Sequence, residues 1–130
     1  VLAGYHGSFR SGTLAVIDIN KGTKEDEGFI CQISGTGKTV EPEYRDTLTE
    51  NVWPQFITPT PITDRVFLTS AWKDVRDRSI GIYVADMEDN VTLLHSQKGC
   101  AFLEPIPLLR RTQPPVLADL VKLDSPKATV

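Results

Sequence analysis

Four side chains in this 130-residue sequence have the chemistry of soft metal ligands: His6, Cys31, His95 and Cys100. Structural zinc sites and covalently attached c-type haem need such residues in short motifs, such as C-x-x-C, H-x-x-x-H or C-x-x-C-H. None of these motifs occurs, and His95 and Cys100 are related only loosely, across an expected turn. We therefore assign no metal-binding or cofactor-binding residue. His6 and Cys100 are kept only as candidates to reach a metal in a neighbouring domain.

A second chemistry suggested by the sequence is phosphate binding, because the segment GTGKT at 35–39 resembles the end of a phosphate-binding loop. The full pattern G-x-x-x-x-G-K-[ST] requires a glycine where this chain has Gln32. It also requires a helix directly afterwards, and Pro42 opposes one there. We interpret the segment as a turn.

Nucleophilic catalysis has no complete motif either. His6 lies in a loop rich in Gly and Ser, a setting in which functional residues are common, but no partner that would orient it as a base can be identified. A G-x-S-x-G motif is absent from the sequence. We assign no catalytic residue.

Cys31 and Cys100 are the only cysteines, too few for a disulfide framework. They can form one bridge in an oxidising compartment or remain free thiols, which are usually buried. The sequence does not fix the distance between them.

The elements that would position these residues are short strands. Runs rich in β-branched and aromatic residues, bounded by turn formers, predict strands at 13–19, 28–33, 55–58, 66–71, 80–86 and 91–95. Two of the runs place an aspartate, Asp18 or Asp86, after their β-branched residues, and we expect both to accept hydrogen bonds from turn amides. The last four strands together have the size of one propeller blade. We predict an all-β fold, a partial β-propeller of about one and a half four-stranded antiparallel blades with a proline-rich tail.

The predicted organisation divides the chain into four parts. Residues 1–34 are expected to hold the outer strands of a preceding blade, and residues 35–52 a polar connecting loop. Residues 53–97 are expected to form one full four-stranded blade. Residues 98–130, with prolines that exclude a central strand or a helix, are expected to be a linker toward a following module.

Composition excludes some classes of function. A net charge of −3 argues against a nucleic-acid surface, which usually carries a basic stripe. No apolar run approaches the roughly 18 residues that a transmembrane helix needs. The first residue is not Met and the last residues begin a β-favouring run, so we expect a fragment of a longer protein.

Several stretches, taken in order, resemble one known family. They are YHGSFRSGTLAVIDINKG, PITDRVFLTSAW, IGIYVADMEDNVTLLH, FLEPIPLLRRTQPPV and KATV. The sequence is similar to the middle, propeller domain of the hydrazine synthase alpha subunit and its WD40-like and TolB-like relatives, and the resemblance covers most of the chain.

The resemblance implies an extracytoplasmic (periplasmic or secreted) location and a structural or interaction scaffold for neighbouring redox domains or subunits. The partners would be the remaining blades of the same propeller and adjacent domains or subunits. Haem c would belong to the parent protein, because its attachment motif does not occur in this sequence. Two alternatives stay open: part of a haem-dependent, hydrazine-forming oxidoreductase, and a TolB-like propeller that binds a peptide or glycan.

Overall fold

The computed structural model describes residues 2–3, 11–24, 26–34, 52–74, 76, 79–110 and 113. Within these residues the chain forms strands and no helix. The strands are β1 (Leu2–Ala3), β2 (Gly12–Ile17), β3 (Phe29–Ile33), β4 (Gln55–Pro61), β5 (Val66–Trp72), β6 (Ile80–Asp86) and β7 (Val91–His95). The prediction of an all-β fold is confirmed. His6 and nearly all of the predicted 35–52 loop lie outside the described residues.

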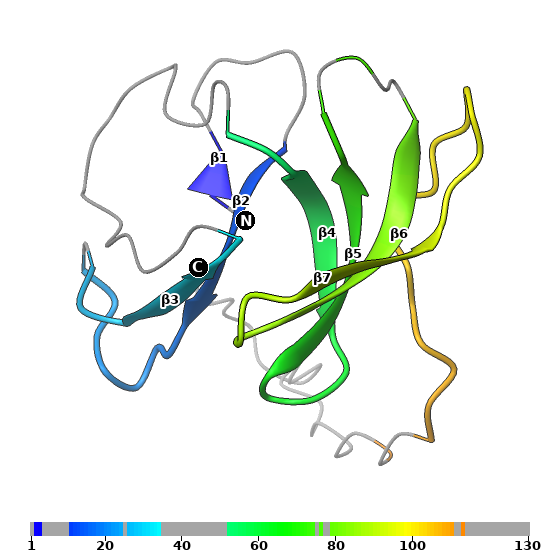
Figure 1. Cartoon of the computed structure of the whole chain (residues 1–130). Helices are drawn as coiled ribbons and strands as arrows, with labels where there is room; N and C mark the ends of the chain where they lie inside the picture. The colour runs from blue at the N-terminus through cyan, green and yellow to red at the C-terminus, as the bar shows by residue number, and fades with distance from the viewer. Residues whose placement is uncertain are drawn as a thin grey trace, which may run out of the picture.

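Most of the strands belong to one continuous antiparallel path. Their order is β1-β2-β4-β5-β6-β7, and β3 pairs with β2 off this path. The sheet is strongly curled, so β3 and β7 lie on the same side of it (Figure 1). A right-handed twist accumulates from strand to strand, which makes such curling the normal outcome for short, strongly twisted strands.

The strands β4 to β7 form a meander in which each pairs with the next. β5 and β6 are in register along their whole length, from Val66 opposite Asp86 to Trp72 opposite Ile80. Because side chains alternate between faces, Phe67, Thr69 and Ala71 share one face of the sheet with Tyr83 and Ala85. All four strands predicted between residues 53 and 97 are confirmed.

β4 is longer than predicted because a bulge accommodates its prolines. Ile57 pairs with Ser70 and Thr60 with Leu68, so Thr58 and Pro59 together lie opposite one residue of β5. Thr58 has a positive φ of 46°. The Thr69 hydroxyl donates to the Ile57 carbonyl at 3.1 Å, which satisfies an acceptor next to the bulge. The strand can therefore continue to Pro61.

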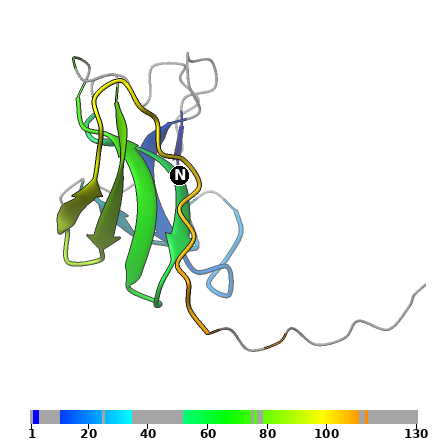
Figure 2. The same cartoon turned by 90° about the vertical axis from the view of Figure 1, so that its right-hand side faces the viewer.

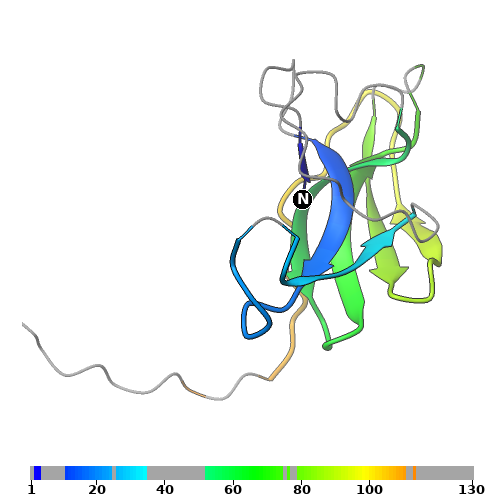
Figure 3. The same ribbon diagram turned by 90° about the vertical axis from the view of Figure 1, so that its left-hand side faces the viewer.

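β2 and β3 form a hairpin that is only narrowly joined to the meander. β2 pairs with β3 from Leu14 to Ile17, but it pairs with β4 only where Gly12 lies opposite Phe56. β2 ends at Ile17, earlier than the predicted residue 19. In Figure 3, which looks from the side of the hairpin, β2 and β3 lie in front of the meander, and β2 continues the sheet next to β4.

The core lies between the hairpin and one face of the meander, which we call the inner face. Leu14 and Ile33 come from the hairpin, and Phe56, Ala71, Tyr83 and Ala85 come from the meander. Phe56 and Ile33 are each 1% exposed. Most of the hydrophobic stabilisation therefore depends on these two parts staying together.

The opposite, outer face of the meander is covered in part by the chain that follows β7. Phe102 N donates to Ile80 O at 3.0 Å, and Glu104 N donates to the Thr58 hydroxyl at 3.2 Å. The chain thus crosses from β6 to β4, on the side away from the hairpin (Figure 2). Pro105, which follows Glu104 in the crossing segment, is buried. The start of the predicted 98–130 linker is therefore packed against the sheet.

Candidate functional site

A group of interacting polar residues lies at one end of the sheet, where the β4–β5 turn, the β6–β7 turn and β3 meet. We call this group the turn cluster; it consists of Cys31, Ser34, Arg65, Asp86, Glu88, Asp89 and Asn90. In a meander, alternate turns lie at the same end of the sheet, so β4–β5 and β6–β7 necessarily bring their turn residues together. β3 then reaches the cluster because the sheet curls.

Asp86 organises the β6–β7 turn. One of its carboxylate oxygens, Oδ1, accepts hydrogen bonds from Glu88 N and Asn90 N, both at 3.0 Å. The Asn90 side-chain amide also donates to the carboxylate, at 2.9 Å to Oδ2. The hydrogen bonds from Asn90, above all that of its side chain, lower the pKa of Asp86, because they favour the ionised form.

Asp18 has the same role at the end of β2. Its Oδ1 accepts a hydrogen bond from Asn20 N at 3.0 Å and another from the Asn20 side chain at 3.1 Å. The prediction that Asp18 and Asp86 accept hydrogen bonds from turn amides is confirmed. Turn structure therefore accounts for both aspartates.

Arg65 connects the two turns of the meander. Its guanidinium forms an ion pair with Glu88, and its carbonyl accepts a hydrogen bond from Met87 N at 3.1 Å. Both side chains of the ion pair are more than half exposed, at 57% and 52%. An exposed pair contributes little to stability, so its main effect is to align the two turns.

Asp89 connects the meander to the hairpin. Ser34 N, directly after β3, donates a hydrogen bond to the Asp89 carboxylate. Asp89 has a φ of 71°, a conformation that Asp and Asn tolerate better than most residues. The contact joins residues 55 positions apart and closes the curled sheet at this end.

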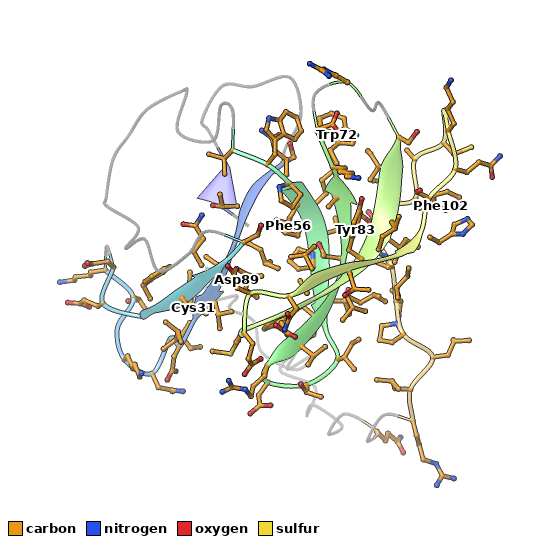
Figure 4. All side chains as sticks on the ribbon, viewed as in Figure 1. Cys31, Phe56, Trp72, Tyr83, Asp89 and Phe102 are labelled. Carbon is orange, nitrogen blue, oxygen red and sulfur yellow. The ribbon has the colours of Figure 1, made fainter. Side chains whose placement is uncertain are left out.

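Cys31 lies next to this contact, and Figure 4 shows Asp89 beside it. Burial is the main cause that raises the pKa of the Cys31 thiol; Asp89 and Glu88 raise it further, and Arg65 opposes the shift. A raised pKa keeps the thiol protonated near neutral pH, and a thiolate is the form that attacks substrates or binds metals. The surroundings of Cys31 therefore do not support nucleophilic catalysis.

The sequence-derived candidates are not brought together. Cys31 and Cys100 are both free and half-buried. Cys100 lies in the turn after β7, where its carbonyl accepts a hydrogen bond from Ile80 N at 3.1 Å. His95 packs edge-on against Phe102, with ring centroids 4.7 Å apart. Among the described residues, which do not include His6, no group of three or more His, Cys, Asp or Glu is arranged to hold a metal ion.

Sequence reasoning did not identify the turn cluster as a group. Its members come from three separate turns and strand ends, and no local pattern reports the contact of Ser34 with Asp89. A usable signal does exist for one part of it. Once a meander is predicted, opposite charges on alternate turns, as in Arg65 and Glu88, are expected to lie close together.

Exposed apolar side chains form the other notable feature of the surface. They lie on β7 and on the chain after it: Leu93 (48% exposed), Leu94 (56%), Leu103 (47%), Ile106 (67%), Leu108 (102%) and Leu109 (51%). Ile17 and Ile19, at the far end of β2, are also exposed. β7 lies on the hairpin side of the sheet and the chain after it crosses the opposite side (Figure 1, Figure 2), so the side chains of β7 and those of the chain after it form two separate groups.

Comparisons of the chain with protein families, with curated proteins and with solved structures find no match. The structure contains no helix, among the residues that it describes, of the length and apolarity needed to cross a membrane.

Proposed function

We propose that this chain is a segment of a β-propeller in a secreted protein resembling the hydrazine synthase alpha subunit. Its role would be that of a structural and interaction scaffold, which positions neighbouring redox domains or subunits. In this proposal the meander β4–β7 is one blade, and the β2–β3 hairpin is the outer half of the preceding blade.

The observation that carries the proposal is the way in which the hairpin packs on the meander. Leu14 and Ile33 lie in one core with Phe56 and Tyr83, so the curl of the sheet brings a face of the hairpin against a face of the meander. Blades of a propeller contact their neighbours in the same face-to-face manner. The single pair Gly12–Phe56 between β2 and β4 fits a boundary between two units.

The similarity of the two hairpins adds support. In both hairpins the turn begins with an Asp, Asp18 just after β2 and Asp86 at the end of β6, and each Asp accepts a hydrogen bond from the amide two residues later. Repetition of one supersecondary unit is the hallmark of propellers.

A scaffold role accounts for the surface better than a catalytic role does. The turn cluster holds turns in place and keeps its thiol protonated, as its hydrogen bonds and the raised pKa of Cys31 indicate. The exposed apolar side chains on β7 and after it offer contact area for neighbours. The remaining blades and adjacent redox domains are the proposed neighbours.

The test uses the protein translated from the complete reading frame. The redox association predicts C-x-x-C-H motifs outside these 130 residues and the absorption spectrum of c-type haem in the purified protein. A scaffold role predicts that Leu94→Lys weakens association between the parts of the protein, measured by limited proteolysis, while the haem content stays unchanged. Thr92→Lys, at an exposed polar position of the same strand, is the matched control. A reading frame without haem motifs would overturn the redox part of the proposal.

A further inference from the structure

The segment after β7 repeats the sequence of β4. Residues 56–62 read F-I-T-P-T-P-I and residues 102–108 read F-L-E-P-I-P-L. Phe and both prolines recur at the same spacing, and Ile and Leu exchange at the remaining apolar positions. The two segments are 46 residues apart, within the period of about 40–50 residues that propeller blades show.

The two segments also share an unusual backbone conformation. Thr58, the third residue of the first segment, has a φ of 46°, and Glu104, the third residue of the second, has a φ of 53°. Positive φ is uncommon for residues other than glycine, particularly for a β-branched residue such as Thr. Similar composition alone would not place this conformation at the same position of both segments.

The two segments lie in contact at that position. Glu104 N donates to the Thr58 hydroxyl at 3.2 Å. Each segment also begins near a single pair with an earlier strand: Gly12 of β2 pairs with Phe56, and Ile80 of β6 pairs with Ala101, the residue before the second segment. The first pair is antiparallel and the second is parallel, so the two chain directions relative to the earlier strand differ.

The segments differ in what covers them. β4 pairs with β5, and its Thr60 and the adjacent Ile62 are half-buried. The corresponding residues of the second segment, Ile106 and Leu108, are 67% and 102% exposed. The second segment thus shares with β4 a sequence pattern and one unusual φ, and the described residues provide no β5-like strand beside it.

We propose that residues 102–108 are the first strand of a further unit built like β4–β7, and that a β5-like strand of the same polypeptide pairs with them and covers Ile106 and Leu108. This inference deepens the proposed function and depends on its propeller architecture. In this proposal residues 102–108, which were predicted to be part of a linker, form a surface that one β5-like strand covers.

The test compares thiol labelling of Leu108→Cys in two forms of the protein, this 130-residue chain and the protein from the complete reading frame. Cys31→Ser and Cys100→Ser remove the natural thiols in both. We expect labelling to be about tenfold slower or more in the longer protein, because pairing with a neighbouring strand would protect the side chain. Lys21→Cys, at an exposed turn of the hairpin, is the matched control and is expected to label equally fast in both forms.

Equal labelling of Leu108→Cys in the two forms, with an equal control, would overturn the inference. Slower labelling at both position 108 and position 21 would indicate that the longer protein buries this chain in general, and would also count against the inference. The result is independent of haem. Protection of residue 108 in a protein without haem would refute the redox scaffold and support the added strand. Haem in a protein whose residue 108 is not protected would support the redox association and refute the added strand.

Discussion

The meander β4–β7 and the β2–β3 hairpin begin from similar sequences and end in different structural situations. The apolar runs of β6 and β2 both lead into an Asp and a turn, with Asp86 as the last residue of β6 and Asp18 directly after β2. β6 is enclosed by paired strands on both edges, whereas β2 meets β4 at one residue pair and leaves Ile17 56% exposed. The comparison shows that the local sequence pattern specifies a hairpin. The neighbouring strands determine whether the edges of its strands are paired along their length.

The change with the largest expected effect removes the side chain shared by the two regions. Phe56 is 1% exposed and packs against both hairpin and meander residues. Phe56→Ala should lower the free energy of unfolding by about 3–5 kcal/mol, because it leaves a cavity between the two parts. Urea unfolding followed by tryptophan fluorescence measures this. Leu94→Ala, at a site 56% exposed, is the control and should change stability by less than about 0.5 kcal/mol.

A smaller effect is expected from a change confined to the meander. A Cβ at Gly81 would lie 2.9 Å from the His95 carbonyl oxygen and 3.0 Å from Leu93 Cδ1. Gly81→Ala should therefore displace β7 from β6 and lower stability by about 1–3 kcal/mol. Hydrogen exchange should rise in β7 and stay unchanged in β3. Equal increases in both strands would show that the two regions unfold as one unit.

A still smaller effect is expected where the two regions meet at the turn cluster. Asp89→Ala removes the acceptor of Ser34 N and places a residue less suited to positive φ at this position. We expect faster exchange of the Ser34 amide and a loss of about 0.5–1.5 kcal/mol. Asp89→Asn keeps an oxygen acceptor and tolerates the conformation, so it should retain most of the protection. Identical behaviour of the two variants would contradict the assigned contact.

The smallest effect is the pH dependence of the β6–β7 turn. The hydrogen bonds from Asn90 hold the pKa of Asp86 below its ordinary value of 3.8. A lowered pKa in the folded state means that the stabilisation is complete above pH 3.8 and is lost as the pH falls through the lower, folded value. NMR titration of the Glu88 and Asn90 amides in acid should report this transition, and Asp86→Asn should abolish it. A midpoint at or above 3.8 would contradict the assignment.

The positions of the longer strands could be predicted because each is a short β-favouring run between turn residues. β3, β5, β6 and β7 match their predicted ranges to within a residue. β4 was predicted too short because prolines usually end strands. The bulge at Thr58, next to the hydrogen bond from the Thr69 hydroxyl, lets β4 pair with β5 on both sides of Pro59. β1 spans only two residues, too few for a pattern to reveal.

The arrangement of these strands was harder to predict from the sequence. The curling of the sheet and the contact of Ser34 with Asp89 depend on twist and on packing over long sequence distances. The candidate metal ligands were chosen by residue type, and the structure shows that Cys31 gains its surroundings from two distant turns. The remaining functional predictions rest on resemblance and stay predictions.

The register shift between β6 and β7 has a consequence for how this protein can assemble. Leu93 and His95 pair with consecutive residues of β6, so Leu94 has no residue opposite it. Such an irregularity bends the outermost strand and prevents a second strand from adding smoothly alongside it. Growth of the molecule into open-ended fibrils through this edge is thereby discouraged, although the strand is neutral and rich in leucine.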